Sequence, residues 1–243
     1  MRNSLRRPIL LYAFLTFVLF SPHLPARAQD PFEEPRRNMV DQQLRRRGIR
    51  QSELLNAMET VPRHLFVPER QRPEAYVDEP VAIGPDGDSL LQPYMTARMI
   101  ELLKLDGTQK VLEIGTGSGY DAAVLSKLAR EVYTIEISPT RGEEARSRLK
   151  ALGYKNVFVH IGDGNQGLPG QAPFDAILLT AAPERIPPKL IEQLKIHGRM
   201  VAAVGGSPIQ QLTLLVKTAE RVEKRSIEPV VFGPLIDDGE RKP

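Results

Sequence analysis

The motif VLEIGTGSGY, which begins at Val111, constrains the fold of this chain more than any other stretch. Its apolar start predicts a buried strand, and the apolar spacing over residues 120–128 predicts a helix. Gly115, Gly117 and Gly119 occupy the turn between them. Glycines let the backbone turn tightly and approach a ligand, and the start of a helix offers free N–H groups. The motif therefore predicts an α/β fold with a polar ligand at this turn.

Three acidic residues lie at or near the ends of predicted strands. Glu113 is inside the first strand, Glu136 ends the apolar run 132–135, and Asp163 follows the run 157–161. A carboxylate in a strand needs a partner, and a cationic amino group suits Glu113 better than a pyrophosphate does. Glu136 is placed to accept hydrogen bonds from both ribose hydroxyls, and Asp163 to reach an exocyclic amine. Together they favour S-adenosylmethionine, although each acid alone is typical of a solvated loop and a nicotinamide dinucleotide is a distant alternative.

The order of the predicted elements gives the fold class. Further strands are predicted at 174–182 and 198–205, and an antiparallel pair at 210–216 and 230–232. The chain is therefore expected to be α/β with a Rossmann-like, mostly parallel, doubly wound sheet, a C-terminal antiparallel strand pair and N-terminal helices. Ligands of such sheets bind at the carboxyl ends of the strands.

The N-terminus has the features of a secretory signal. Arginines at the start, an apolar run over 9–20 and an Ala-Arg-Ala site predict a signal peptide at residues 1–28. The run is shorter than the roughly 20 residues of a membrane-spanning helix, so no stable membrane span is expected. We expect a linker at 29–37, a single domain at 38–243 and an exported protein. A cytoplasmic location is the alternative, because S-adenosylmethionine is made in the cytosol.

Composition excludes several other classes of function. The net charge is only +3, and the arginines are concentrated near the N-terminus, which is not typical of nucleic-acid binding. The chain has no cysteine and only four scattered histidines, so neither disulfides nor a metal site are expected.

From about Asn38 to Leu235 the chain resembles the protein-L-isoaspartate O-methyltransferases, which methylate the free carboxylate of isoaspartyl residues in damaged proteins. The glycine motif is shared by many methyltransferases, whereas the combination of the other motifs is specific to this family. The motifs that carry the resemblance are MVDQQLRRRGI at 39–49, VPRHLFVP at 61–68, AYVDEPVAIG at 75–84, VLEIGTGSGYDAAVLSKL at 111–128, GYKNVFVHIGDG at 153–164, APFDAILLTAA at 172–182 and QLKIHGRMVAAVG at 193–205.

The resemblance implies an enzyme that repairs L-isoaspartyl, and as an extension D-aspartyl, residues with S-adenosylmethionine as methyl donor. Isoaspartyl proteins or peptides are the expected partners, without nucleic acid, and the chain is expected to be a monomer. The residues assigned to the donor are Glu113, Gly115, Gly117, Gly119, Glu136, Asp163, Gly164 and Gln92, and those assigned to the acceptor are Thr180, Ala181 and Gln210.

One position departs from the family pattern. Leu91 stands where the family has its active-site serine, and Asp88 replaces a glutamine. Ser89, two residues earlier on an extended segment, is a weak substitute for the missing hydroxyl. We therefore expect slow rather than absent methylation. The alternatives are a redirected homologue that binds the cofactor without turnover, and a methyltransferase for another carboxylate acceptor.

Overall fold

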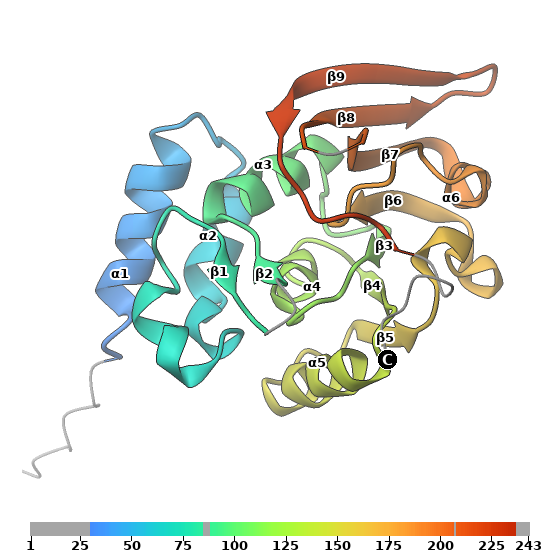
Figure 1. Ribbon diagram of the computed structural model, residues 1–243. Helices are drawn as coiled ribbons and strands as arrows, with labels where there is room; N and C mark the ends of the chain where they lie inside the picture. Colours follow the sequence, from blue (N-terminus) through green and yellow to red (C-terminus); the bar gives the residue numbers. More distant parts are fainter. Residues whose placement is uncertain (1–29, 85–87, 207, 237–243) are drawn as a thin grey trace, which may run out of the picture. The chain divides into compact units, whose positions relative to one another are not determined.

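A seven-stranded sheet with the order β5-β4-β3-β6-β7-β8-β9 forms the centre of the fold. The computed structural model describes residues 30–84, 88–206 and 208–236. Strands β5, β4, β3, β6 and β7 are parallel, and β8 and β9 join them as an antiparallel pair, as the sequence predicted. In Figure 1 the sheet runs from β9 at the top to β5 at the bottom. The strands are β3 (Lys110–Ile114), β4 (Glu131–Glu136), β5 (Val157–Ile161), β6 (Phe174–Leu179), β7 (Leu194–Val204), β8 (Gln210–Lys217) and β9 (Val222–Val230).

Helices cover both faces of the sheet because side chains alternate along each strand. In β3, Val111 belongs to the apolar core that packs against helices α3 (Pro93–Leu103), α4 (Tyr120–Leu125) and α5 (Pro139–Ala151). Leu112 and Ile114 point into the opposite core, which is covered by α6 (Pro188–Gln193). The doubly wound architecture follows from this division of apolar side chains.

Helices precede the sheet, and they begin earlier than expected. Helix α1 spans Glu33–Asn38 and continues into a π-helical segment, η1 (Met39–Arg45), before α2 (Ser52–Thr60). Part of the range 29–37, which we expected to be a linker, is therefore helical. The apolar pattern begins only at Met39 because α1 buries none of its residues, so periodicity gives no signal there. The predicted signal peptide lies outside the described residues.

Short elements connect the N-terminal helices to the sheet. The range 61–68 contains a 3-10 turn, η2 (Arg63–Leu65), and a second, η3 (Glu69–Glu74), follows it. The loop before α3 forms a small antiparallel hairpin of β1 (Val81–Ala82) and β2 (Ser89–Leu90). Residues 88–91, which contain the Leu91 position of the family's serine and are called the acceptor loop below, lie at the carboxyl end of the sheet.

The last strand differs from the prediction in position. We expected it at 230–232, but β9 is the charged stretch VEKRSIEPV at Val222–Val230. It is an edge strand with mostly exposed side chains, so it lacks the apolar alternation by which strands are recognised. Residues after Val230 instead cross the strand ends, where Ala182 N donates to Gly233 O at 2.8 Å and Leu235 N donates to Ala182 O at 2.9 Å.

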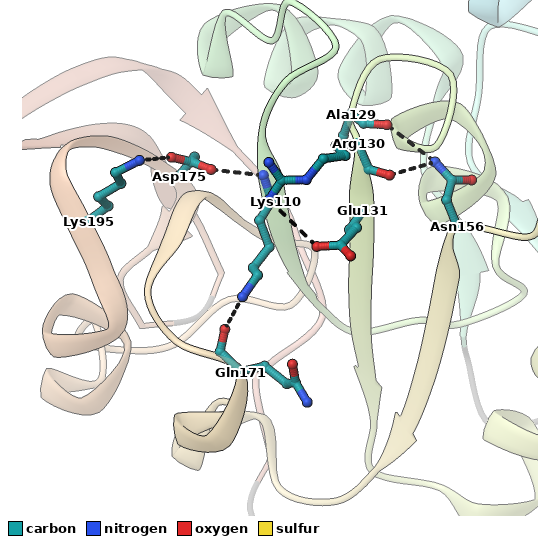
Figure 2. A network of polar contacts seen from close by, with 8 residues as sticks. All are labelled: Lys110, Ala129, Arg130, Glu131, Asn156, Gln171, Asp175 and Lys195. Carbon is teal, nitrogen blue, oxygen red and sulfur yellow. Dashed lines mark hydrogen bonds and ion pairs between the residues drawn. The ribbon is translucent and has the colours of Figure 1, made fainter.

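Polar contacts hold the amino ends of the strands (Figure 2). Asp175 accepts from Lys110 N at 2.9 Å and from Lys195 Nζ at 2.8 Å, which ties together β6, β3 and β7. Lys110 Nζ donates to Gln171 O at 2.7 Å, and Asn156 Nδ2 donates to the backbone oxygens of residues 129 and 130. These structural contacts occupy the end of the sheet opposite the glycine turn. Across the described ranges, no helix combines the length and apolar character needed to cross a bilayer.

Candidate active site

A cavity of about 240 Å³ lies at the carboxyl ends of β3, β4 and β6. Its lining includes the glycine turn after β3, the hairpin residues from Asp88 to Leu91, and the C-terminal segment from Val231 to Ile236. Sequence segments far apart in the chain thus meet at one place. This is the edge at which parallel α/β sheets bind ligands.

The backbone of the glycine turn is held close to the end of β6. Gly115 has a φ of +98°, which side chains rarely adopt, and a Cβ at this position would lie 2.6 Å from Thr180 Oγ1. That hydroxyl donates to Gly115 O at 2.8 Å and to Ile114 O at 3.0 Å. Gly115, Gly117, Thr180 and Ala181 all line the cavity, as does Gly164 after β5. Only glycine permits this close approach of the turn to the strand.

Glu136 reaches the cavity from the end of β4. Its Oε2 accepts from Gly117 N at 2.9 Å and its Oε1 from Ser138 N at 3.0 Å. Arg141 Nε, in the first turn of α5, lies 3.5 Å from Oε1. Burial raises the pKa of Glu136, and the backbone hydrogen bonds oppose that rise. The carboxylate is thus fixed beside the glycine turn, where a ribose diol requires an acceptor.

The other two predicted acids do not line the cavity. Glu113 is 0% exposed, and its Oε2 accepts from Thr134 Oγ1 at 2.6 Å. Its Oε1 is buried without a hydrogen-bond partner among the described residues. Asp163 turns instead onto the start of the 3-10 turn η4 (Gly164–Gln166), where it accepts from Asn165 N at 2.8 Å. The expected convergence of three carboxylates on one cavity therefore holds for Glu136 alone, because β3 points Glu113 into the core and Asp163 caps a turn.

Asp121, which the sequence analysis did not single out, lines the cavity next to Glu113. It lies in the first turn of α4, is only 7% exposed, and accepts from Thr96 Oγ1 at 2.9 Å through Oδ1. Burial raises the pKa of Asp121. Burial and then the neighbouring charge of Asp121 raise the pKa of Glu113 well above its ordinary value. The available signal was an acidic residue directly after the glycine motif, within the first turn of the following helix.

The hairpin loop presents Ser89 and Leu91 to the cavity. Ser89 is exposed, and Leu91 is partly buried against the main core. Arg63, 0% exposed, donates from Nε to Ala75 O and from Nη2 to Leu91 O, both at 2.6 Å. Its guanidinium carbon lies 4.8 Å from the centre of the Tyr120 ring. Arg63 thus fixes the backbone of the acceptor loop from below.

Three further predicted residues support the cavity without lining it. Gln210 Oε1 accepts from Phe232 N at 2.9 Å and so holds the C-terminal segment. Gln92 Nε2 donates to Asp78 O at 2.8 Å at the start of α3. Gly119, with a φ of +90°, begins α4 and packs on Leu149. These three residues thus lie outside the cavity lining, and their predicted contacts with donor or acceptor stay predictions.

The residues of the cavity fit S-adenosylmethionine. The backbone of Gly115 and Gly117 lines the cavity, and glycines bring no side chain between that backbone and a ligand. Glu136 offers a fixed carboxylate for a ribose diol. Asp121 adds a second buried carboxyl group to the lining, and Arg141, the cationic side chain that lines the cavity within the described ranges, is paired with Glu136 and Asp88. A donor that carries an ammonium, a sulfonium and a ribose but no phosphate matches this set.

Comparisons with known proteins agree with this geometry. Residues 34–240 match the model of the family described as protein-L-isoaspartate(D-aspartate) O-methyltransferase. A protein-L-isoaspartate O-methyltransferase from Synechococcus sp. (strain JA-2-3B'a(2-13)) is 48% identical over 219 residues, which cover 87% of this chain and 89% of that protein. Protein-L-isoaspartate O-methyltransferase 2 from Shewanella sediminis is 43% identical over 242 residues, covering 96% of this chain and 99% of the relative.

Solved structures give the same result. A protein-L-isoaspartate O-methyltransferase structure superposes with a TM-score of 0.74 at 28% identity, covering 82% of this chain and 65% of that chain. A Plasmodium falciparum protein solved in complex with S-adenosyl-L-homocysteine superposes with a TM-score of 0.71 at 23% identity, covering 84% of this chain and 99% of that chain, and so supports the fold. With a methyltransferase fold, a donor cavity that fits S-adenosylmethionine and a family match over most of its length, this chain belongs to the protein-L-isoaspartate O-methyltransferase family.

Proposed function

We propose that the chain transfers a methyl group from S-adenosylmethionine to the free carboxylate of L-isoaspartyl residues in damaged proteins. The observation that carries this proposal is that the glycine turn and the family's acceptor loop line one cavity. The family match and the curated relatives support the choice of acceptor. D-Aspartyl residues are a second acceptor, in keeping with the family description.

The chemistry asks the protein mainly for placement. The donor, when bound, supplies a methyl group activated by the sulfonium, and the acceptor carboxylate is already a competent nucleophile. Bringing two reactants into the right geometry can contribute about 7–11 kcal/mol to lowering a barrier. Glu136 and the glycine turn hold one reactant, while the loop that Arg63 fixes holds the other. No general base is required, because the attacking oxygen carries no proton.

Because position 91 is a leucine, we expect methyl transfer to be slow rather than fast. The Leu91 side chain lines the cavity but cannot donate a hydrogen bond to the acceptor carboxylate. Ser89 also lines the cavity, and its exposed position supports the view that it substitutes only weakly. A redirected homologue that binds the donor without turnover, and a methyltransferase for another carboxylate, are the alternatives that Leu91 keeps open.

The test is methyl transfer to paired synthetic peptides. Peptides that differ only in an L-isoaspartyl, D-aspartyl or L-aspartyl residue at one position are incubated with the chain and radiolabelled S-adenosylmethionine. Base-labile label in the isoaspartyl peptide, and none in the L-aspartyl peptide, supports the proposal. Tight binding of S-adenosylhomocysteine by calorimetry, with no transfer to any of the three, would replace it with the redirected homologue. Transfer to small carboxylates alone would favour the other methyltransferase.

Export of the protein is a separate proposal, based on the pattern at residues 1–28. Mass spectrometry of the protein from fractionated cells should find Gln29 as the first residue, and an intact N-terminus in the cytosol would contradict export. We also propose a monomer, which sedimentation equilibrium tests.

A further inference from the structure

Asp121 is a second buried acidic residue, besides Glu136, that lines the donor cavity. Glu136 is held at the end of β4 by the backbone of Gly117 and Ser138. Asp121 enters from α4, and the hydrogen bond from Thr96 ties it to α3, which begins directly after the acceptor loop. Both residues line the same cavity. A ligand that fills the cavity therefore meets both carboxyl groups.

Asp121 has an oxygen available to a ligand. Oδ1 accepts from Thr96 Oγ1, whereas no partner for Oδ2 is found within residues 30–84, 88–206 and 208–236. The residue is nonetheless only 7% exposed. A carboxylate that is largely withdrawn from water and incompletely hydrogen-bonded is destabilised in its charged form. A ligand cation would relieve that cost.

Glu113 does not line the cavity, but it interacts electrostatically with Asp121 and adds to the negative potential there. It is 0% exposed, and its Oε1 has no partner in the described part of the chain. The charged and titratable groups that act on this acidic pair, Glu113 and Asp121, are Arg63 from η2 and Glu136 from β4. Arg63 is the cation among them, and two of its nitrogens are committed to backbone oxygens. The charge of Arg63 acts on Asp121, whereas no cation of the described residues acts on Glu113, so the two carboxyl groups share a single buried counter-ion.

We infer that Asp121 binds the ammonium group of the donor's amino-acid end, with Glu113 as the buried charge behind it. This inference rests on the donor assignment of the proposed function, and it transfers to Asp121 the role that sequence reasoning gave to Glu113. It also implies a linkage to protons. In the empty cavity the acidic pair retains a proton above the ordinary carboxyl range, and an ammonium stabilises both charged forms. Ligand binding then releases a proton, so affinity rises with pH.

The test uses calorimetry to compare the affinities of two ligands for the wild-type protein and for the Asp121→Asn variant. S-Adenosylhomocysteine carries the amino-acid end, whereas 5′-methylthioadenosine has the same nucleoside without it. Asp121→Asn should weaken the binding of S-adenosylhomocysteine by about 10- to 100-fold, the range for a hydrogen bond between charged groups. The substitution should change the affinity for 5′-methylthioadenosine by no more than about twofold, because that ligand has no ammonium. Asp106→Asn, which changes an exposed carboxylate in the same way, is the matched control and should alter neither affinity.

Each other outcome overturns the assignment. An equal loss of affinity for both ligands would mean that Asp121 only supports the fold of the cavity. No loss of affinity for either would mean that Asp121 does not contact the ligand. A loss for S-adenosylmethionine but not for S-adenosylhomocysteine would place Asp121 at the sulfonium instead. These binding results do not depend on methyl transfer, so they separate this inference from failure of the proposed function.

A pH series supplies the second readout. As pH rises above the ordinary carboxyl range, the wild-type protein should bind S-adenosylhomocysteine more tightly, and buffers of different ionisation enthalpy should report net proton release. The dependence should be smaller in Asp121→Asn and absent for 5′-methylthioadenosine. The same slope with both ligands would contradict a link between the acidic pair and the ammonium.

Discussion

Replacing Leu91 with serine should speed methyl transfer to isoaspartyl peptides. Leu91 lines the cavity, and Arg63 Nη2 holds its carbonyl at 2.6 Å. Because that contact involves only the backbone, the substitution should leave the path of the loop unchanged. A serine Oγ at this place can donate to the acceptor carboxylate, which leucine cannot. Hydrogen bonds to charged groups are worth about 1.5–3 kcal/mol, so the rate should increase by about 10- to 150-fold.

The substitution also has a cost in stability. Leu91 is partly buried against the main core, and a fully buried leucine contributes about 1.5–3 kcal/mol. Losing part of that burial should lower the free energy of unfolding by about 1 kcal/mol. Rates should therefore be compared at a temperature where both proteins are folded, as checked by circular dichroism.

The assay is initial-rate transfer of radiolabel to an isoaspartyl peptide, with Leu91→Ala as the matched control. Alanine removes the leucine side chain without adding a hydroxyl, so it measures relief of crowding alone. The reasoning predicts a rate for serine well above that for alanine. Equal rates for the two variants, or a serine variant no faster than wild type, would refute the view that a missing hydroxyl limits this enzyme.

Three other substitutions test the site. Glu136→Gln should weaken S-adenosylhomocysteine and 5′-methylthioadenosine alike, by about tenfold or more in calorimetry, because both carry the ribose diol; a loss confined to one of them would exclude a ribose contact. Gly115→Ala should lower the free energy of unfolding in urea by at least about 1–2 kcal/mol, the cost of a left-handed backbone, with partial recovery in the double variant with Thr180→Ala; unchanged stability would show that the turn is not strained. Burial raises the pKa of Glu113 above its ordinary value of 4.5, so its contribution to stability is fully present below that value and is lost as pH rises through the raised pKa. Glu113→Gln should therefore flatten the decline of unfolding free energy as pH rises above the ordinary carboxyl range; an unchanged slope would contradict the shift.

Much of the sheet was predictable because its central strands are buried on both faces. Strand β3 reads as an apolar run that stops at Gly115, and such a run before a glycine turn has few other interpretations. Strand β9 was misplaced because it is a charged edge strand, whose pairing depends on β8 rather than on its own pattern. Helix α1 escaped detection for a related reason, since it buries no residue.

The types of residue that form the site were predictable from the sequence, but the directions in which their side chains point were not. Glycines in a strand-to-helix turn and an acid at the end of the next strand placed the donor, and Glu136 fulfils its expected position. Whether a strand residue faces a cavity or the core depends on the register of its neighbours, so the sequence did not indicate that Glu113 is buried outside the cavity lining. Asp121 reaches the cavity only because α4 begins immediately after Gly119. The support that Arg63 gives to Leu91 joins segments that no local pattern connects.

A crystal structure of the protein with S-adenosylhomocysteine would test the central claim most directly. The account predicts the ligand lying against the backbone of Gly115, with both ribose hydroxyls within hydrogen-bond distance of Glu136 and the thioether facing Leu91. Ligand density in another part of the protein, or a ribose held by residues other than Glu136 with the glycine turn left uncovered, would contradict it.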